Sequence, residues 1–469
     1  MSSANGMAEP ASLVLDQDKL TLVADDLSFS DFFRQLSHLG VTIKADPSLA
    51  GTITSVVVDE PLDKAFERLL RPYGYAAIWE VVRGPLGDMP RLAELQVFRE
   101  GQRERIRPVV ENTRFDITRG PTGRGPAYVQ DEILITVKRG VSKEEFKRWL
   151  AQIGGTLAGS VPGVGVYRIR LPPGTNIEAL IAQLENSPLI HAVEPNYAAE
   201  LPPGNGLATG ELPPGAIAPK IPKGAAAVAV LDSGLSSAYS LGTAVAGSYD
   251  AVVPGRTLDD PKGHGTQMAM VASGAVKPKG TENDVTAGTP VLAIRAFDEE
   301  GRTSNYALMR SIEYAVEGGA RVINISWGSD TESEFVADSI AYAQSKGLVV
   351  VAAAGNEPTG QQVYPASLPG VVSVAALNSQ GELWNQSNYG DTVSFAAPGA
   401  AEFPIGHEGP PGSYVGTSIA SVYVAKQFAE YFTANPNATA KQAKEALVKM
   451  ARDEGTKGRD PRYGYGVLD

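Results

Sequence analysis

The sequence has no cysteine among its 469 residues. Disulfide bonds, thiolate metal sites and cysteine nucleophiles are therefore excluded. Long apolar runs are also missing, since no stretch approaches the roughly 18 apolar residues that a membrane-spanning helix needs. Basic residues are outnumbered by acidic ones, and the formal net charge is −12. Because phosphate contacts need a basic face, this charge argues against a nucleic-acid-binding protein.

The N-terminal residues MSSANGMAEPASLVLDQD contain no basic segment followed by an apolar segment. They therefore lack the pattern of a secretory signal peptide. Two interpretations stay open: a cytoplasmic protein, or an exported protein whose signal peptide was removed before this sequence was defined.

Glycine and proline are plentiful, with 50 and 33 residues, and indicate many turns and linkers. The length predicts about three domains. Shifts in composition and hydrophobic period predict a flexible leader at 1–16, a domain at 17–100, a linker at 101–127, a domain at 128–200, a linker at 201–224 and a domain at 225–469.

The first two domains share one order of elements, β-α-β-β-α-β, so two small α+β domains are expected. Capping boxes begin both helices of the second domain, Ser142 with Glu145 and Thr175 with Glu178. The first linker is rich in Arg, and a solvated linker is favoured over a docking patch or a processing site. The second is rich in Pro and Gly, and is expected to be extended and easily cleaved.

The domain at 225–469 alternates apolar runs with helical stretches. Runs such as AVAVL and GLVVVAAAG are typical of strands that are buried on both faces. The alternation predicts an α/β fold with a doubly wound, mostly parallel sheet. In such folds ligands bind at the carboxyl ends of the strands, so the polar residues that close these runs are the candidate site.

Four polar residues stand at such positions. Asp232 ends AVAVL, and Asn356 closes VVVAAAGN. His264 lies in the turn GHGT, and Ser418 begins a long apolar helix. Each residue alone is typical of a turn or a helix cap. Together they supply a hydroxyl nucleophile, an imidazole base, a carboxylate that orients the base, and an amide donor for an oxyanion.

The segments AVLDSG, GHGTQMAMVASG, NISWGS, AAAGN, SFAAPG and GTSIA resemble, in order, the signature segments of the subtilisin-like (subtilase) family across 225–469. The order Asp, His, Ser is also that of subtilisin. The resemblance implies a serine endopeptidase in which Asp232 orients His264. It implies that His264 is general base and then general acid, and that Ser418 is acylated. The Asn356 side chain and the Ser418 backbone N–H would form the oxyanion hole.

The domain at 128–200 resembles the inhibitory propeptide of this family in its element order and its ending, HAVEPNYA. The resemblance implies a zymogen whose propeptide assists folding and then occupies the cleft with its C-terminal tail. Autocleavage is therefore expected between Ala198 and Lys223.

The resemblance also implies a cleft in which the substrate pairs as a strand between two edge segments. The implied substrate-binding residues are Gly301, Arg302 and Thr303 on one edge, Ser326, Trp327 and Gly328 on the other, Ala353, Ala354 and Gly355 in the S1 walls, and Val363 near the S1 floor. Trp327 and Val363 indicate restricted pockets. The acidic residues 298–300 are interpreted as a solvated turn, the alternative being a preference for basic side chains upstream of the cut.

The domain at 17–100 resembles the short N-terminal domain of secretins and TonB-dependent receptors, most clearly in VTIKADPSLAGTITSVVVDEPLDKAFERLLRPYGY. The resemblance implies an extracytoplasmic setting, periplasmic or secreted, and a docking partner for this domain.

Some residues depart from the subtilase pattern. Val422 and Tyr423 follow GTSIAS where Pro is usual, Gln267 replaces a common second His, and Lys426 replaces a common Gly. None of these removes a catalytic group. The family's familiar calcium loop is not recognisable after GHGT, so no cofactor is expected. Calcium is unsupported but not excluded, because scattered carbonyl oxygens can bind it.

Alternative functions are weighed against the protease. The departures after Ser418 motivate a catalytically degenerate or permanently inhibited subtilase that acts as a binding or scaffold module. An α/β-hydrolase esterase would need a His after the Ser, and the last one, His407, precedes it. Nucleotide chemistry is unsupported, because the sequence has no phosphate-binding loop. The expected partners are therefore protein or peptide substrates and the propeptide, and the sequence does not set the oligomeric state.

Overall fold

The structure is a computed structural model that describes residues 12–16, 18–109, 114–120, 123, 125–202, 219–237, 239, 241–254, 256, 258–281 and 288–469. The chain divides into two compact units. The first contains Met1–Asn112 and Val129–Asn196, and the second contains Thr113–Tyr128 and Tyr197–Asp469.

The N-terminal part of the first unit contains two sheets, with strand orders β1-β2-β4 and β5-β6-β3-β7. Phenylalanines of both helices, among them Phe32, Phe33 and Phe66, pack with leucines of β2 in one core. The elements are β1 (Ser12–Asp16), β2 (Lys19–Ser28), α1 (Phe29–His38), β3 (Thr42–Ala45), β4 (Thr52–Pro61), α2 (Leu62–Leu69), β5 (Gly74–Val82), β6 (Met89–Phe98), η1 (Arg103–Arg105) and β7 (Arg107–Pro108).

The predicted strands and helices of this part are present, but two predictions are wrong. The leader predicted at 1–16 ends in β1, which pairs antiparallel with β2. The predicted closing strand, β5, is followed by β6, which pairs with both β5 and β3. The missed strand MPRLAELQVF carries charged and small residues that weaken its period of two. Residues 1–11 lie outside the described part of the chain.

The second half of the first unit is a sheet of order β10-β11-β9-β12 with two helices. The capping box of Ser142 and Glu145 is confirmed at the start of α3. The box predicted for α4 is wrong, because Asn176 caps that helix and the Thr175 hydroxyl donates to the Pro172 carbonyl. The elements are β9 (Ala127–Val137), α3 (Lys143–Gln152), β10 (Thr156–Val161), β11 (Val166–Arg170), α4 (Ile177–Leu184) and β12 (Ile190–Glu200).

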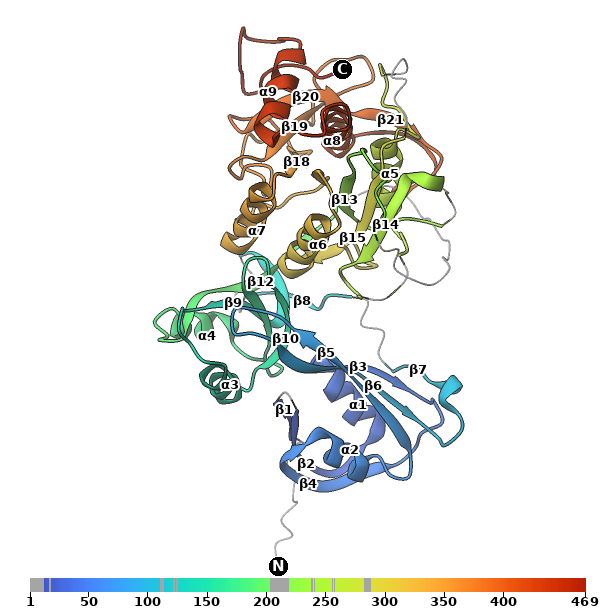
Figure 1. Cartoon of the computed structure of the whole chain (residues 1–469), viewed down its shortest axis with the longest axis vertical. Helices are drawn as coiled ribbons and strands as arrows, with labels where there is room; N and C mark the ends of the chain where they lie inside the picture. Colours follow the sequence, from blue (N-terminus) through green and yellow to red (C-terminus); the bar gives the residue numbers. More distant parts are fainter. Residues whose placement is uncertain are drawn as a thin grey trace, which may run out of the picture. The chain divides into compact units, whose positions relative to one another are not determined.

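The second unit is built on a parallel sheet of seven strands, β14-β15-β13-β17-β18-β19-β20. Helices α5 and α8 cover one face of it, and α6 and α7 cover the other (Figure 1). The predicted doubly wound α/β fold is confirmed. Its elements are β8 (Ile117–Arg119), β13 (Val228–Asp232), η2 (Gly242–Ala244), β14 (Val245–Asp250), α5 (His264–Ser273), β15 (Val291–Arg295), β16 (Arg302–Ser304), α6 (Asn305–Glu317), β17 (Val322–Ile325), α7 (Glu334–Ser345), β18 (Val349–Ala353), β19 (Val372–Leu377), β20 (Val393–Pro398), β21 (Ala400–Phe403), β22 (Gly412–Val415), α8 (Thr417–Ala434) and α9 (Ala440–Met450).

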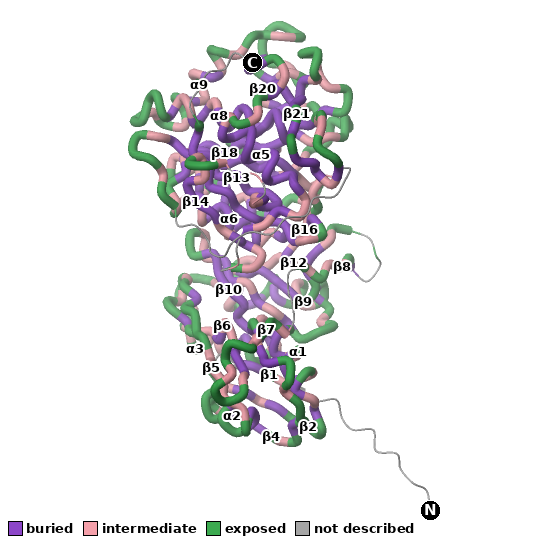
Figure 2. Tube along the Cα trace, turned by 90° about the vertical axis from the view of Figure 1, so that its right-hand side faces the viewer, coloured by how far each residue is buried: buried purple, intermediate pink, exposed green. Residues whose placement is uncertain are grey.

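Buried residues are concentrated in the central strands and in α5 and α8 (Figure 2). Every residue of β13, β17 and β18 is buried, which explains why these strands are continuous apolar runs in the sequence. Among the described helices, none is long and apolar enough to cross a membrane.

The linkers are partly ordered. The first, at 101–127, contains η1, β7 and β8. The second, at 201–224, begins with Leu201, whose backbone N–H donates to the Gly301 carbonyl at 2.8 Å. Residues 203–218, where most of the expected cleavage window falls, lie outside the described residues.

Candidate active site

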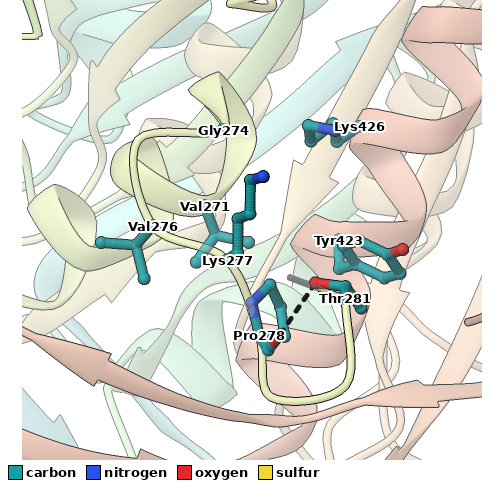
Figure 3. Close-up of a pocket in the computed structure, with 8 residues that line it drawn as sticks. All are labelled: Val271, Gly274, Val276, Lys277, Pro278, Thr281, Tyr423 and Lys426. Carbon is teal, nitrogen blue, oxygen red and sulfur yellow. Dashed lines mark hydrogen bonds between the residues drawn. The ribbon is translucent and has the colours of Figure 1, made fainter. Parts of the chain in front are cut away.

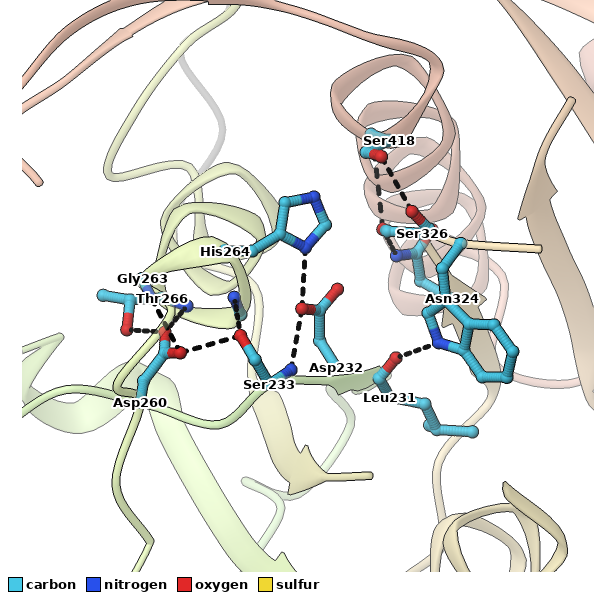
Figure 4. A network of polar contacts seen from close by, with 12 residues as sticks. Leu231, Asp232, Ser233, Asp260, Gly263, His264, Thr266, Asn324, Ser326 and Ser418 are labelled. Atoms are coloured by element: carbon cyan, nitrogen blue, oxygen red, sulfur yellow. Dashed lines mark hydrogen bonds and ion pairs between the residues drawn. The ribbon is translucent and has the colours of Figure 1, made fainter. Parts of the chain in front are cut away.

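The contact between Asp232 and His264 is the centre of the site. Asp232 is the last residue of β13, and His264 is the first residue of α5. His264 Nδ1 lies 2.7 Å from Asp232 Oδ1 (Figure 4). Because a carboxylate can only accept, Nδ1 carries the hydrogen of this bond. The other nitrogen, Nε2, is then left with a free lone pair in the neutral imidazole.

Glycines let α5 approach β13 this closely. A Cβ at Gly265 would lie 2.4 Å from the Gly234 carbonyl oxygen, far inside contact distance. Gly263, directly before the helix, has a φ of 78°, which favours glycine. The motif GHGT is therefore required by backbone sterics as well as by chemistry.

Asp260 fixes the start of α5 and was not singled out from the sequence. Its carboxylate accepts from the backbone N–H of Gly263 at 2.9 Å and of Thr266 at 2.7 Å. The Ser233 hydroxyl donates to Asp260 at 2.7 Å and accepts from Gly265 N at 2.8 Å (Figure 4). Burial raises the pKa of Asp260 more than these hydrogen bonds lower it. The signal in the sequence is an Asp four residues before the His, in DPKGH.

The charges around His264 favour its protonated form. Burial disfavours the charged imidazolium, but the charge of Asp232 and its hydrogen bond outweigh burial and raise the pKa of His264. Asp260 and Glu408 add to the rise.

Ser418 lies in the first turn of α8, after Gly416. Its hydroxyl donates to the Ser326 carbonyl oxygen at 2.7 Å, while among the described residues no hydrogen bond joins it to His264. Figure 4 shows His264 and Ser418 at the starts of two helices, with Asp232 below the His264 ring. The structure thus joins Asp232 to His264 and leaves the hydroxyl turned toward Ser326.

Asn356 is held by the same helix start. Its Oδ1 accepts from Thr417 N at 3.0 Å and from Thr417 Oγ1 at 2.7 Å, so its Nδ2 points elsewhere. A Cβ at Gly416 would lie 3.7 Å from Asn356 Nδ2 and 3.8 Å from Ser418 N. Both N–H donors therefore border one small space beside Gly416, which is the arrangement that an oxyanion needs.

The segment 301–303, expected to bind substrate, is paired with another strand of the same chain. Within the second unit Ala198, Ala199 and Glu200 of β12 pair antiparallel with Ser304, Thr303 and Arg302. Trp327, expected in the facing segment, is buried with its ring edge-on to Phe297 at 5.0 Å. Its Nε1 donates to the Leu231 carbonyl at 3.2 Å. Trp327 also lines a hollow with Ala198, Ala199 and Thr303.

The residues expected around S1 lie together. A Cβ at Gly328 would lie 2.3 Å from Val363 Cγ1, and one at Gly355 would lie 3.2 Å from Val363 Cγ2. Val363 thus stands between these two glycines. Ala353 and Ala354, at the end of β18, are buried.

In the acidic segment 298–300, where the sequence predicts a solvated turn, Asp298 is buried, whereas the Glu299 and Glu300 side chains are 32% and 41% exposed. Asp298 accepts from the backbone N–H of Glu300 and of Arg302, both at 2.9 Å. Glu300 pairs with Arg302 at 2.5 Å and with Arg114 at 2.7 Å. These carboxylates therefore shape the edge at 301–303 and bind arginines of the same chain.

The departures from the subtilase pattern leave the hydrogen bond between Asp232 and His264 intact. Gln267 Nε2 donates to the Ile405 carbonyl at 2.8 Å. Lys426 is buried, pairs with Glu430, and lines a small cavity between α5 and α8 with Gly274 and Tyr423 (Figure 3). Within the described residues no group of three or more His, Cys, Asp or Glu side chains could hold a metal ion.

Comparisons with known proteins find similarity over most of the chain. Residues 223–466 match the Subtilase family, and residues 120–196 match the Fervidolysin N-terminal prodomain. The thermophilic serine proteinase of Bacillus sp. (strain AK1) is 33% identical over 310 residues, which are 64% of this chain and 77% of that protein. The minor extracellular protease Epr of Bacillus subtilis (strain 168) is 32% identical over 244 residues, 51% of this chain but only 37% of Epr.

A solved structure shares the fold. The crystal structure of fervidolysin from Fervidobacterium pennivorans, described as a keratinolytic enzyme related to subtilisin, superposes with a TM-score of 0.59 at 23% identity, over 76% of this chain and 63% of that chain.

The fold, the prodomain and these relatives define a serine endopeptidase that is made with a propeptide. The chain belongs to the subtilase family, as the sequence predicts.

Proposed function

We propose that Ser418 hydrolyses peptide bonds through an acyl-enzyme, with His264 as its base and Asp232 as the group that orients the base. The observation that carries this proposal is the 2.7 Å contact of His264 Nδ1 with Asp232 Oδ1, made at the C-terminal end of a central parallel strand. It leaves Nε2 able to accept a proton.

The reaction follows from these groups. The Ser418 hydroxyl turns from the Ser326 carbonyl and gives its proton to His264 Nε2 as Oγ bonds to the substrate carbonyl carbon. The resulting imidazolium returns the proton to the leaving amine as the C–N bond breaks. Water then attacks the ester by the same route and releases the acid. Catalytic hydrogen bonds are often absent before substrate binds, so the resting hydroxyl is compatible with this role.

Asn356 Nδ2 and the Ser418 backbone N–H are proposed as the oxyanion-hole donors. The support is that both border the space beside Gly416 and that Thr417 fixes the orientation of the amide. Such donors act on charge that develops in the transition state and need no reorganisation.

The substrate is proposed to add as a strand along Gly301, Arg302 and Thr303, facing the segment Ser326, Trp327 and Gly328. The pairing of residues 198–200 with this edge is the supporting model for substrate. The P1 side chain would enter beside Ala353, Ala354 and Gly355, with Val363 as a floor that limits its size.

The domain boundaries of the sequence analysis, 128–200 for the propeptide and 225–469 for the catalytic domain, are kept as part of this proposal, with autocleavage in the linker between them. The domain at 17–100 is proposed to dock to a partner, in an extracytoplasmic setting. The similarity to Epr, which is named an extracellular protease, supports that setting.

The test is an expression time course analysed by intact mass, comparing the parent chain with Ser418→Ala. We expect the parent to yield a product that begins between Ala199 and Gly224, and the variant to stay at full length. Casein hydrolysis should accompany the processed product and fall by about 10⁶ in the variant, the loss known for subtilisin without its serine.

A catalytically degenerate subtilase predicts the opposite result. If the parent stays whole, and casein stays intact even after the linker is cut by another protease, the scaffold alternative replaces the protease. If casein is cut only after such treatment, the zymogen needs an external activator.

A further inference from the structure

A second histidine lies against the candidate base. His407 belongs to the loop that connects β21 and β22, and its ring centroid lies 4.6 Å from that of His264, with 55° between the planes. The residue is 7% exposed, so its ring is an internal wall of the site. The role proposed for His264 makes no use of this contact.

The loop is fastened to the turn that carries His264 on both sides of His407. Before it, the Ile405 carbonyl accepts from Gln267 Nε2 at 2.8 Å. After it, Glu408 N donates to the Lys262 carbonyl at 3.1 Å, and the two side chains form an ion pair. The departure at Gln267 therefore has a clear structural task, which is to anchor this loop.

The backbones of this loop and of the turn before α5 also pack closely together. A Cβ at Gly263 would lie 2.1 Å from the Gly406 carbonyl oxygen. The Tyr414 hydroxyl accepts from His407 N at 3.2 Å. Contacts of the His407 backbone, of Gly406 before it and of Glu408 after it therefore fix the position of His407. Its ring has little freedom to move away from His264.

His407 is held in the neutral form. Burial, the neighbouring His264 and the Lys262 ammonium lower the pKa of His407 to about 2. Its Nε2 is buried and has no hydrogen-bond partner in the described part of the chain. A buried polar atom without a partner is destabilising. Hydrogen bonding of this side chain therefore does not account for the residue, and its role is sought in the contact of its ring with His264.

We propose that His407 is a positioning residue for His264, which rests on the proposed role of His264 as base. Its neutral ring holds the His264 imidazole in the orientation set by Asp232. It also offers an aromatic face to the imidazolium that forms during acylation, a favourable contact for a cation. The charged or titratable groups around the pair are Asp232, Asp260, Lys262 and Glu408.

The test compares His407→Phe, His407→Leu and His407→Ala in the processed protease. Phe keeps an aromatic ring, Leu keeps only volume, and Ala keeps neither. We expect kcat within threefold of the parent for Phe, and a loss of about tenfold for Leu and Ala, with KM changed by less than about twofold. Equal kcat for Phe and Leu, or parental kcat for Ala, overturns the proposal.

The pH profile gives a second readout. Because His407 stays neutral, the acid limbs of kcat/KM for the parent and His407→Phe should coincide between about pH 5 and 8. Separate limbs would show that His407 itself titrates in this range, and would overturn the proposal.

Two measurements distinguish the proposed role of His407 from an effect on folding and from a failure of the proposed catalytic function. Phe403→Leu, in the same hairpin and in contact with Tyr414, is the control for loosening of the hairpin, and we expect lower thermal stability with near-parental kcat. The low-field Nδ1–H NMR resonance of His264, recorded in Ser418→Ala, needs no activity. It should persist in His407→Phe and broaden in His407→Ala, and a sharp signal in both overturns the proposal.

Discussion

The Asp232–His264 hydrogen bond fixes the protonation behaviour expected of the site. The base must be neutral to accept a proton, and the pKa of His264 is raised above its ordinary value of 6.5 because the charge and hydrogen bond of Asp232 outweigh burial. Half of the enzyme is then protonated, and inactive, at a pH above 6.5. We expect the acid limb of kcat/KM to have its midpoint above that pH, and a midpoint below it contradicts the assignment.

Removal of the Asn356 amide tests the oxyanion hole. We expect Asn356→Ala to lower kcat by roughly 10²–10³, the loss that subtilisin shows when its own asparagine is replaced, with little change in KM. Thr417→Val is the matched control. It removes only the hydroxyl that donates to Asn356 Oδ1 at 2.7 Å, and we expect kcat to fall roughly fivefold. Equal effects of the two variants would assign both to misfolding of the helix start.

The residues proposed for the chemistry could be singled out from the sequence, whereas the residues that hold them in place were not. Asp232, His264 and Ser418 follow apolar runs in a recognisable order, and the sequence has few histidines. Asp260 holds the start of α5 mainly through the nearby Gly263 and Thr266, whereas His407 acts through contacts between segments that the sequence separates. His407 N, for example, reaches Tyr414, while its ring meets His264, 143 positions earlier. Nothing in a local pattern distinguishes His407 from an ordinary loop residue, whereas the Asp of DPKGH four residues before His264 is a signal that could have found Asp260.

At the scale of elements, the pairing of β12 with β16 carries a prediction. Leu201→Pro removes the N–H that donates to the Gly301 carbonyl at 2.8 Å. One neutral hydrogen bond contributes about 1 kcal/mol, so an N-terminal fragment that includes residue 201 should inhibit the processed protease about fivefold less well. Leu201→Ala, which keeps the N–H, is the control. Equal inhibition constants for the two variants would show that the bond does not contribute.

Elements with strong local signals were found from the sequence, and elements that depend on partners were missed. Helix α3 has both a capping box and an amphipathic period. Strands β1 and β6 have weak periods, and each exists because a neighbour in the sheet completes its hydrogen bonds. At α4 the neighbouring residues Thr175 and Asn176 both suit a cap, and the turn at Pro172 takes the threonine hydroxyl.

At the scale of the molecule, one buried carboxylate ties three strands of the first unit together. Glu132 of β9 pairs with Arg168 and Arg170 of β11, and accepts from Asn196 Nδ2 of β12 at 2.8 Å. Burial opposes its charge, but the two arginines and these hydrogen bonds prevail, and the pKa of Glu132 is lowered from 4.5. Its contribution to stability is therefore fully present above pH 4.5 and is lost as pH falls through the lowered pKa.

We expect Glu132→Gln to destabilise this sheet by about 3 kcal/mol at neutral pH, the lower end of the range for a broken buried ion pair, because the two arginines left without their charge partner are 22% and 21% exposed. The difference from the parent should narrow as pH falls below 4.5. Hydrogen exchange of β9 and β12, measured in Ser418→Ala, reports the change, and exposed Glu178→Gln is the control. A difference that is constant with pH would contradict an ionised Glu132.

The antiparallel pairing of residues 198–200 with β16 also has a consequence for the order of synthesis. The ribosome completes this strand first, then its partner at Arg302–Ser304, and Ser418 only afterwards. At about 5–20 residues per second, roughly 10–45 s separate Glu200 from Ser418. A nascent chain therefore has both of these paired strands before Ser418 is made. A newly made molecule never contains Ser418 without the segment that pairs with β16.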